Sequence, residues 1–233
     1  MKTLGLIGGM SWESTALYYR LINEGVRESL GGLHSAQLLL WSFDFEEVER
    51  CQAEDRWEDA THMMVDAGER LERGGAEALV ICTNTMHLMA DEVEAAVGLP
   101  VVHIADATAE GVKRRGVGRV ALLGTAYTME QEFYRGRLVN RHGLDVVIPG
   151  PADRTVVHSV IYDELCMGTV RDASKTRYLE IIERLVVDGA EGIILGCTEI
   201  GLLVGQDDLD VPVFDSTLLH AEKAVAVALS DET

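Results

Sequence analysis

The chain has 233 residues, four cysteines and a formal charge of −19, from 20 basic and 39 acidic side chains. This length suits one large α/β domain or two lobes of about 100–150 residues each, and a hydrophobic fraction of 47% with only four prolines excludes intrinsic disorder. The acidic balance argues against a nucleic-acid partner, because the phosphate backbone would be repelled, and no apolar run approaches the roughly 18 residues of a membrane span. No small-residue cleavage site follows the apolar run Leu4–Ile7. The sequence therefore predicts a first strand rather than a signal peptide, a cytoplasmic location and free thiols.

Short apolar runs alternate along the chain with amphipathic segments of helical period, which is typical of parallel sheets covered by helices. The predicted strands are Thr3–Gly8, Gln37–Phe43, Ala78–Cys82, Val101–Ile104, Val120–Gly124, Asp145–Ile148, Gly192–Gly196 and Val211–Phe214. The predicted helices are Ser14–Leu30, Asp55–Arg73, Met86–Val97, Ala105–Arg115, Met129–His142, Ala152–Met167, Ala173–Asp188 and Thr217–Leu229. This order of elements predicts an α/β fold.

Two parts of the sequence recur after about half its length. The run Leu4–Gly8 resembles Val120–Gly124, and Gly75–Asn84 recurs as Gly189–Glu199. The second pair keeps Gly-Ala-Glu, a strand and Cys-Thr in the same order. A repeat of this length predicts two similar α/β lobes rather than a solenoid.

A Cys-Thr pair stands at the carboxyl end of a predicted strand in both copies of the repeat, at Cys82 and at Cys197. Ligand sites in doubly wound sheets lie just beyond the carboxyl ends of the strands. We therefore expect the two lobes to face a shared cleft, with the two thiols approaching one bound molecule from opposite sides. Both cysteines precede predicted helix starts, which favour a thiolate. Two opposed thiols suit removal of a proton from one face of a carbon and its return to the other, which is racemisation or epimerisation.

Other residues leave narrower alternatives. His87 follows Cys82 by five residues, so it either pairs with a nucleophilic cysteine or orients a backbone group in the first turn of a helix. Cys51 and Cys166 have no CxxC spacing and no histidines in ligand register, so we expect no metal site. No GxGxxG pattern follows the first strand, so we expect no dinucleotide cofactor.

The two cysteine motifs, Cys82–His87 (Cys-Thr-Asn-Thr-Met-His) and Ile193–Ile200 (Ile-Ile-Leu-Gly-Cys-Thr-Glu-Ile), resemble the two signatures of the aspartate/glutamate racemase family. The resemblance spans the whole chain, since Gly8-Gly9-Met10 and the Gly124-Thr125-x-x-Thr128 pattern also fit that family. Within it, Trp12-Glu13-Ser14-Thr15 and Tyr127-Thr128-Met129-Glu130 look most like the broad-specificity amino acid racemase branch.

This resemblance implies pyridoxal-independent racemisation of a free amino acid, without a cofactor, between two pseudosymmetric lobes of a homodimeric protein. It implies that residues 1–98 and 211–233 form one lobe and residues 99–210 the other. Cys82 is implied to be the base for the D-isomer and Cys197 for the L-isomer. Since no cofactor delocalises the carbanion, hydrogen bonds must stabilise the charge as it develops. The residues implied to hold the substrate's amino and carboxylate groups are Asn84, Thr85, Thr125, Thr128 and Thr198, and those implied to line the pocket are Met10 and Gln52.

The segment after Ile161-Tyr162 bears on the substrate's side chain. Family members specific for acidic amino acids carry a basic residue shortly after such a pair, whereas here Cys166 occupies that position. An unpaired distal carboxylate would be desolvated at a cost. We therefore expect neutral amino acids to be preferred over acidic ones, with cationic side chains open because of Asp163 or Glu164. An aspartate/glutamate racemase proper, with Arg50 or another remote basic residue reaching the pocket, is the alternative.

Two further classes of function remain open. Hydantoin racemases, maleate isomerases and decarboxylases of the same superfamily use similarly placed cysteines. A non-catalytic protein that binds an amino acid without turning it over is also compatible with two lobes. The second cysteine discriminates between them, because a sensor needs no thiol and a decarboxylase needs only one.

Overall fold

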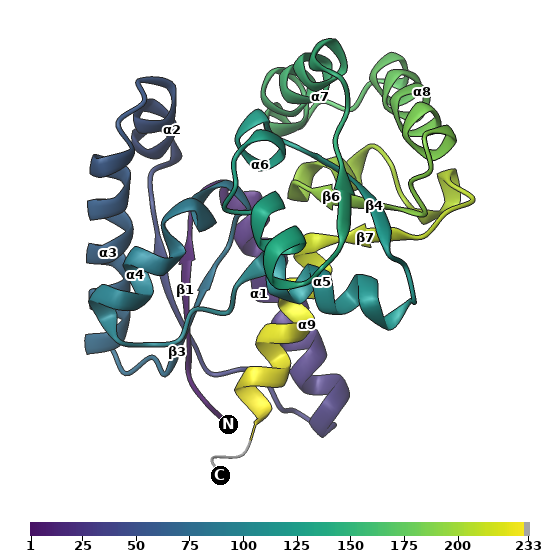
Figure 1. Ribbon diagram of the computed structural model, residues 1–233. Coiled ribbons are helices and arrows are strands. Elements are labelled where there is room, and N and C mark those ends of the chain that lie inside the picture. Colours follow the sequence, from purple (N-terminus) through teal and green to yellow (C-terminus); the bar gives the residue numbers. More distant parts are fainter. Residues whose placement is uncertain (231–233) are drawn as a thin grey trace. The chain divides into compact units, whose positions relative to one another are not determined.

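The computed structural model describes residues 1–230 (Figure 1). The chain divides into two compact units. The first contains Met1–His103 and the chain from His220 onward, and the second contains Ile104–Leu219. Each unit is built on one parallel sheet with helices packed on it, so the predicted α/β fold class is confirmed.

The first unit has a three-stranded sheet of order β2-β1-β3. Its strands are β1 (Leu4–Gly8), β2 (Leu38–Ser42) and β3 (Ala78–Ile81). Its helices are α1 (Trp12–Leu30), α2 (Phe45–Ala53), α3 (Trp57–Arg73), α4 (Ala90–Val97) and most of α9 (Ser216–Leu229), with a 3₁₀ helix at Thr85–Met89.

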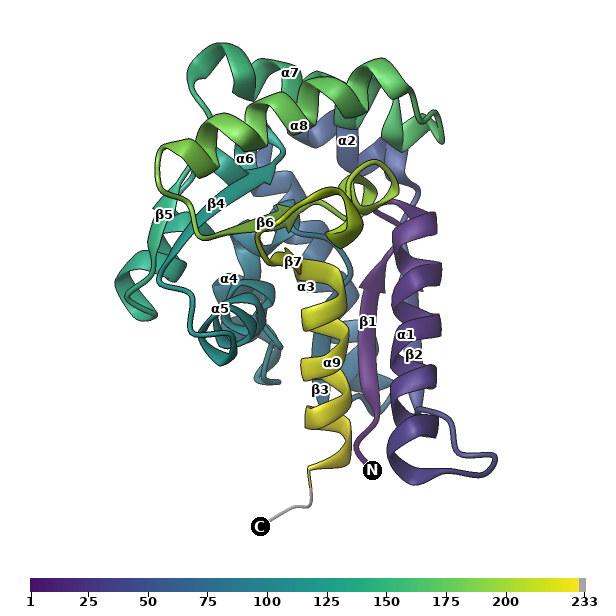
Figure 2. The same ribbon diagram turned by 90° about the vertical axis from the view of Figure 1, so that its right-hand side faces the viewer.

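The side chains of this sheet alternate between two cores, as the two-residue period of a strand requires. Leu6 and Val80 pack with α1 and α9, whereas Ile7 and Ile81 pack with α3 and α4. Figure 2 shows α1 and α9 running alongside β1. Both faces of β1 and β3 are therefore buried, and only the carboxyl ends of the strands are left to carry polar residues.

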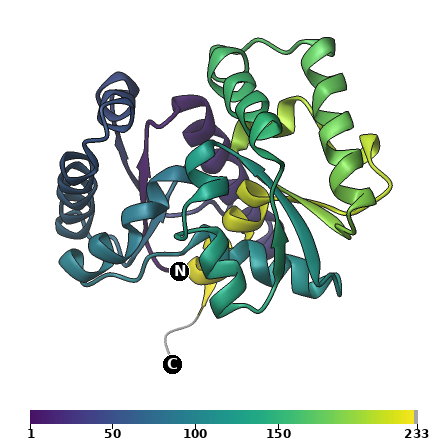
Figure 3. The same cartoon turned by 45° about the horizontal axis from the view of Figure 1, so that its top comes forward.

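The second unit has a four-stranded parallel sheet of order β5-β4-β6-β7. Leu123 and Leu195 face a core with α7 and α8, drawn in green in Figure 3, whereas Leu122 and Ile194 face a core with α5. Its strands are β4 (Arg119–Gly124), β5 (Asp145–Val147), β6 (Gly192–Gly196) and β7 (Val213–Asp215). Its α-helices are α5 (Ile104–Arg114), α6 (Ala126–Glu130), α7 (Pro151–Asp163) and α8 (Asp172–Val187). Shorter turns are a π-helical one at Arg137–Arg141 and 3₁₀ ones at Leu165–Met167, Thr198–Leu202 and Gln206–Asp208.

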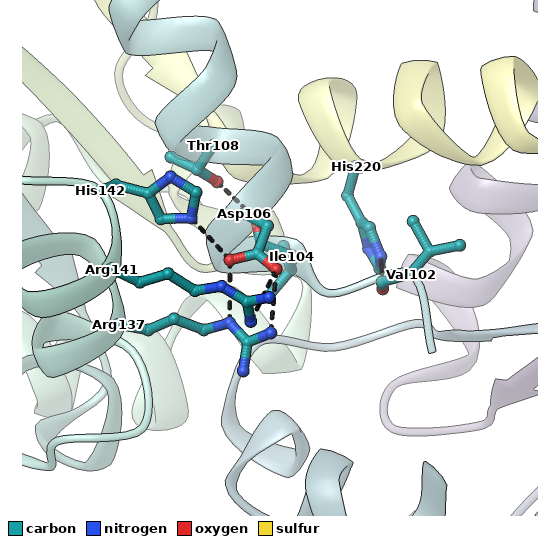
Figure 4. A network of polar contacts seen from close by, with 8 residues as sticks. All are labelled: Val102, Ile104, Asp106, Thr108, Arg137, Arg141, His142 and His220. Carbon is teal, nitrogen blue, oxygen red and sulfur yellow. Dashed lines mark hydrogen bonds and ion pairs between the residues drawn. The ribbon is translucent and has the colours of Figure 1, made fainter. Parts of the chain in front are cut away.

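An ion-pair cluster ties α5 to the π-helical turn (Figure 4). Asp106 accepts two hydrogen bonds from Arg137, at 2.8 and 2.9 Å, and one from the His142 ring at 2.7 Å. Arg141 lies 3.7 Å from the same carboxylate. The cluster fixes the segment that replaces the second half of the predicted helix Met129–His142, where α6 already ends at Glu130.

Other elements differ from prediction for identifiable reasons. The predicted strand Val101–Ile104 is reduced to one bridge between Val101 and Leu79, because α5 begins at Ile104. An unpredicted helix, α2, begins after Asp44, whose side chain accepts the N–H of Glu46 as an N-cap.

The boundaries between the units also differ from the predicted ones, at residues 98 and 211. Val101 bridges to β3 of the first sheet, so the first unit extends to His103. The strand β7 pairs with β6 of the second sheet, so that unit extends to Leu219. No helix within residues 1–230 is long and apolar enough to cross a membrane.

Candidate functional site

Cys82 follows the last residue of β3 and is completely buried. Its N–H donates to the Ile7 carbonyl (2.9 Å), its carbonyl accepts from the Ser14 hydroxyl (3.1 Å), and its sulfur lies 3.8 Å from the Val80 carbonyl. The thiol packs in the core that contains Tyr18 and α9. The backbone of Cys82 is therefore held from both sides, and Ser14 is a contact that the sequence analysis did not identify.

Asn84, two residues further on, is 4% exposed. Neither its amide nitrogen nor its amide oxygen has a hydrogen-bond partner among the described residues. Burying such a group unpaired costs about 1–3 kcal/mol. A buried donor and acceptor side by side have the chemistry to bind a carboxylate or an ammonium group.

The other predicted residues of the first unit also lie at the ends of its strands or near them. Met10 is buried after β1. Gln52 lies in α2, and its side-chain amide donates a hydrogen bond to the Met86 sulfur at 3.1 Å. Thr85, the residue before Met86, is also buried.

His87 contacts the backbone of the turn that follows Cys82. Its Nδ1 lies 2.7 Å from the Thr83 carbonyl, so the ring binds the backbone of the turn that follows Cys82. The interpretation as a histidine that orients a backbone group is confirmed by this contact.

In the second unit, Cys197 follows β6 and is half-buried. Its thiol donates to a carboxylate oxygen of Glu199 at 2.9 Å. Glu199 was not among the predicted site residues. The signal that could have identified it is an acidic residue two positions after the cysteine, where its side chain can reach back to the sulfur.

Three predicted threonines surround the same strand ends. The hydroxyls of Thr125 and Thr128 lie 3.2 Å apart, and the Thr125 oxygen also caps α6. A Cβ at Gly196, immediately before Cys197, would lie 3.2 Å from the methyl group of Thr128, which shows how closely that threonine approaches the strand. Thr198 instead accepts from the Thr217 hydroxyl of α9 at 3.2 Å.

Cys166 and Cys197 pack against one hydrophobic core, together with Tyr162. Cys166 is near enough to contribute to the raised pKa of Cys197. Glu164 is engaged elsewhere, because its carboxylate accepts from the hydroxyl of Ser174 (2.6 Å) and pairs with Arg171 (3.2 Å). The surroundings of Cys166 are therefore apolar and aromatic.

The surroundings of both thiols raise their pKa values. Burial raises the pKa of Cys82 well above its ordinary value. Burial, followed by the Glu199 carboxylate, raises the pKa of Cys197. The prediction that helix starts favour the thiolates is wrong here, because each cysteine precedes only a five-residue 3₁₀ helix, too short to outweigh desolvation.

Within residues 1–230, no group of three or more histidine, cysteine, aspartate or glutamate side chains is placed to hold a metal ion. The fold and the two strand-end cysteines define a class of α/β proteins built as two similar units, each with a thiol where the sheet presents its carboxyl ends.

A model of the Asp/Glu/hydantoin racemase family matches residues 7–224, and the chain belongs to this family. A solved structure of a Yersinia pestis protein, provisionally assigned as an Asp/Glu racemase, is 53% identical with a TM-score of 0.94, over 99% of this chain and 100% of that one. An aspartate racemase homologue from Pyrococcus horikoshii OT3 is 37% identical with a TM-score of 0.85, over the same shares. The broad-specificity amino-acid racemase RacX of Bacillus subtilis is 22% identical over 72% of this chain and 71% of its own. Racemases are isomerases, and membership of the family implies an isomerase activity.

Proposed function

We propose that the protein is a cofactor-independent racemase of free amino acids that transfers protons at Cα with two cysteine bases, Cys82 and Cys197. The observation that carries the proposal is the equivalent placement of these two thiols, each directly after the last residue of a buried parallel strand in its own unit. The family supports the class of reaction.

In this proposal the bound substrate brings a positive charge close to the thiols. The ammonium group of an amino acid stabilises a nearby thiolate and lowers its pKa. One thiolate then removes the α-proton, and the opposite thiol donates its own proton to the other face. Glu199 is placed to take up the Cys197 proton when that cysteine must become the base.

Binding of the α-carboxylate and ammonium groups falls to the remaining residues. The unpaired amide of Asn84 contributes a donor and an acceptor from the first unit, with Thr85, and with Met10 and Gln52 lining the pocket. Thr125, Thr128 and Thr198 contribute hydroxyls from the second unit. Donors aimed at the carboxylate stabilise the negative charge that develops when the proton leaves.

We further propose that neutral amino acids are better substrates than aspartate or glutamate. Support comes from three side chains near Cys197 that are not basic. Cys166 and Tyr178 are close enough for electrostatic effects between them and Cys197, and Tyr162 packs against the same hydrophobic core. A distal carboxylate among such groups would lose its hydration without a counter-charge. An acidic preference remains the alternative, since solved relatives are described as Asp/Glu or aspartate racemases.

A panel of single enantiomers in D₂O tests the proposal. We expect each enantiomer to be converted into its mirror image, as measured by chiral chromatography, and to gain deuterium at Cα. The highest kcat/KM is expected for neutral amino acids. Tight binding without exchange would instead support an amino-acid sensor, and release of CO₂ a decarboxylase. Aspartate or glutamate as the best substrate would overturn the neutral preference alone, and Cys166→Lys is expected to shift kcat/KM toward those two substrates.

The homodimer stays a prediction from the family resemblance, and the cytoplasmic location stays a prediction from the sequence. Analytical ultracentrifugation and cell fractionation test them.

A further inference from the structure

Three buried histidine rings are in contact within the first unit. The centroids of His87 and His103 lie 4.8 Å apart, and those of His87 and His220 lie 5.3 Å apart with nearly perpendicular planes. The most exposed of the three, His103, is only 7% exposed. The rings of this cluster therefore pack directly on one another.

Hydrogen bonds fix the proton positions on two of these rings. The His220 Nε2 lies 2.5 Å from the Val102 carbonyl, as Figure 4 shows, and must donate because a carbonyl only accepts. Its Nδ1 is then the acceptor for the Tyr18 hydroxyl at 2.8 Å. By the same reasoning, the His87 Nδ1 carries a proton and donates it to the Thr83 carbonyl.

The consequence of this arrangement lies in the turn after Cys82, where three consecutive carbonyls are bonded. The Cys82 carbonyl accepts from Ser14, the Thr83 carbonyl from the His87 ring, and the Asn84 carbonyl from the His87 N–H at 3.1 Å. His87 therefore holds two of the three peptide groups on which the Cys82 thiol and the Asn84 amide depend for their orientation. Packing against the two other histidines prevents the ring from rotating away.

We propose that His87 is a positioning residue for the Cys82 half of the reaction, acting through the Thr83 carbonyl. The inference rests on the proposed racemase function. In this role the histidine cluster is a rigid support for Cys82 alone and does not act on the other base, Cys197.

A pair of substitutions separates this role from general packing. The amide nitrogen of asparagine superposes on Nδ1 of histidine, and that of glutamine on Nε2, so His87→Asn keeps a donor for the Thr83 carbonyl and His87→Gln does not. We expect His87→Gln to lower kcat at least tenfold and His87→Asn to recover most of that loss. His62→Gln, at an exposed position of α3, is the matched control and should be unchanged.

The diagnostic measurement is the α-deuterium isotope effect on each enantiomer. In His87→Gln the effect should increase for the enantiomer served by Cys82, the D-isomer in the proposed function, and stay constant for the other. If His87→Gln does not fold, Ser14→Ala should produce the same one-sided change, because it releases the neighbouring carbonyl. Equal losses in His87→Gln and His87→Asn, or an unchanged isotope effect, would overturn the positioning role, whereas absence of Cα exchange in the unsubstituted protein would overturn the proposed function itself.

Discussion

The two cysteine turns share a strand, a Cys-Thr pair and a short 3₁₀ helix, but they differ at the residue that follows the pair. In the first unit this residue is Asn84, whose buried amide has no hydrogen-bond partner within residues 1–230, and in the second it is Glu199, whose carboxylate accepts a hydrogen bond from the thiol. Burial alone raises the pKa of Cys82, whereas burial and a negative charge raise that of Cys197. The same backbone arrangement therefore carries a neutral turn with a buried amide in the first unit and an acidic turn with a thiol–carboxylate hydrogen bond in the second.

Removing either thiol should have the largest effect. Cys82→Ala and Cys197→Ala should each lower racemisation by about 10²–10⁴, the usual loss when one general base is removed. Cys51→Ala, at a buried cysteine of α2, is the matched control and should stay near the parent rate. Chiral chromatography of initial rates measures all three, and a parent-like rate in Cys82→Ala would contradict the two-base proposal.

The neutral turn is tested at Asn84. Asn84→Ala should lower kcat/KM by about 10–100-fold, because a hydrogen bond to a charged group contributes about 1.5–3 kcal/mol. The free energy of unfolding should not fall, since the amide has no partner to lose among the described residues. The control is Asn23→Ala, which breaks bonds to Tyr19 and Ala36 and should destabilise the protein in urea titrations. Equal destabilisation of both variants would show that Asn84 is a structural residue.

The acidic turn is tested at Glu199. Glu199→Gln should lower the pKa of the Cys197 thiol, because the carboxylate raises it, and so accelerate alkylation of that cysteine by iodoacetamide near neutral pH. Turnover should nevertheless fall about tenfold, a barrier increase of roughly 1.4 kcal/mol, because the thiol loses its proton acceptor. Mass spectrometry of the alkylated peptide identifies the site. If both the alkylation rate and turnover are unchanged, Glu199 neither raises the pKa of Cys197 nor accepts its proton.

Lowering the pH should have a smaller and gradual effect on the free energy of unfolding, through His220 in the first unit. Burial, together with the neighbouring His87, lowers the pKa of His220 to about 3, against about 6.5 in an unfolded chain. Below pH 6.5 the unfolded chain therefore binds a proton that the folded chain refuses, and stability should fall steadily as the pH drops toward 3. Urea titrations across this window should show a shallower decline for His220→Gln, and parallel declines would exclude His220 as the cause.

The fold class could be predicted because the hydrophobic periodicity of each segment and the internal repeat can be read directly from the sequence. The cysteines and their strand-end positions followed from the same repeat. Glu199, only two positions after Cys197, could have been found from the sequence, because a side chain at that spacing can reach back to the sulfur. Ser14 escaped prediction because its contact with the Cys82 carbonyl joins residues sixty-eight positions apart, which a sequence pattern does not reveal. The raised thiol pKa values were missed for a related reason, since burial of Cys82 depends on α9, which lies far along the chain.

The carboxylate beside Cys197 has a consequence for the two directions of reaction. Mirror-image amino acids have equal free energy in water, so an enzyme that interconverts them must have the same kcat/KM for both. Unequal surroundings of the two thiols can make kcat differ between the two enantiomers only if KM differs by the same factor. The enantiomer that turns over faster at saturation must also require the higher concentration to saturate the protein, and the asymmetry of Glu199 cannot enrich either hand at equilibrium.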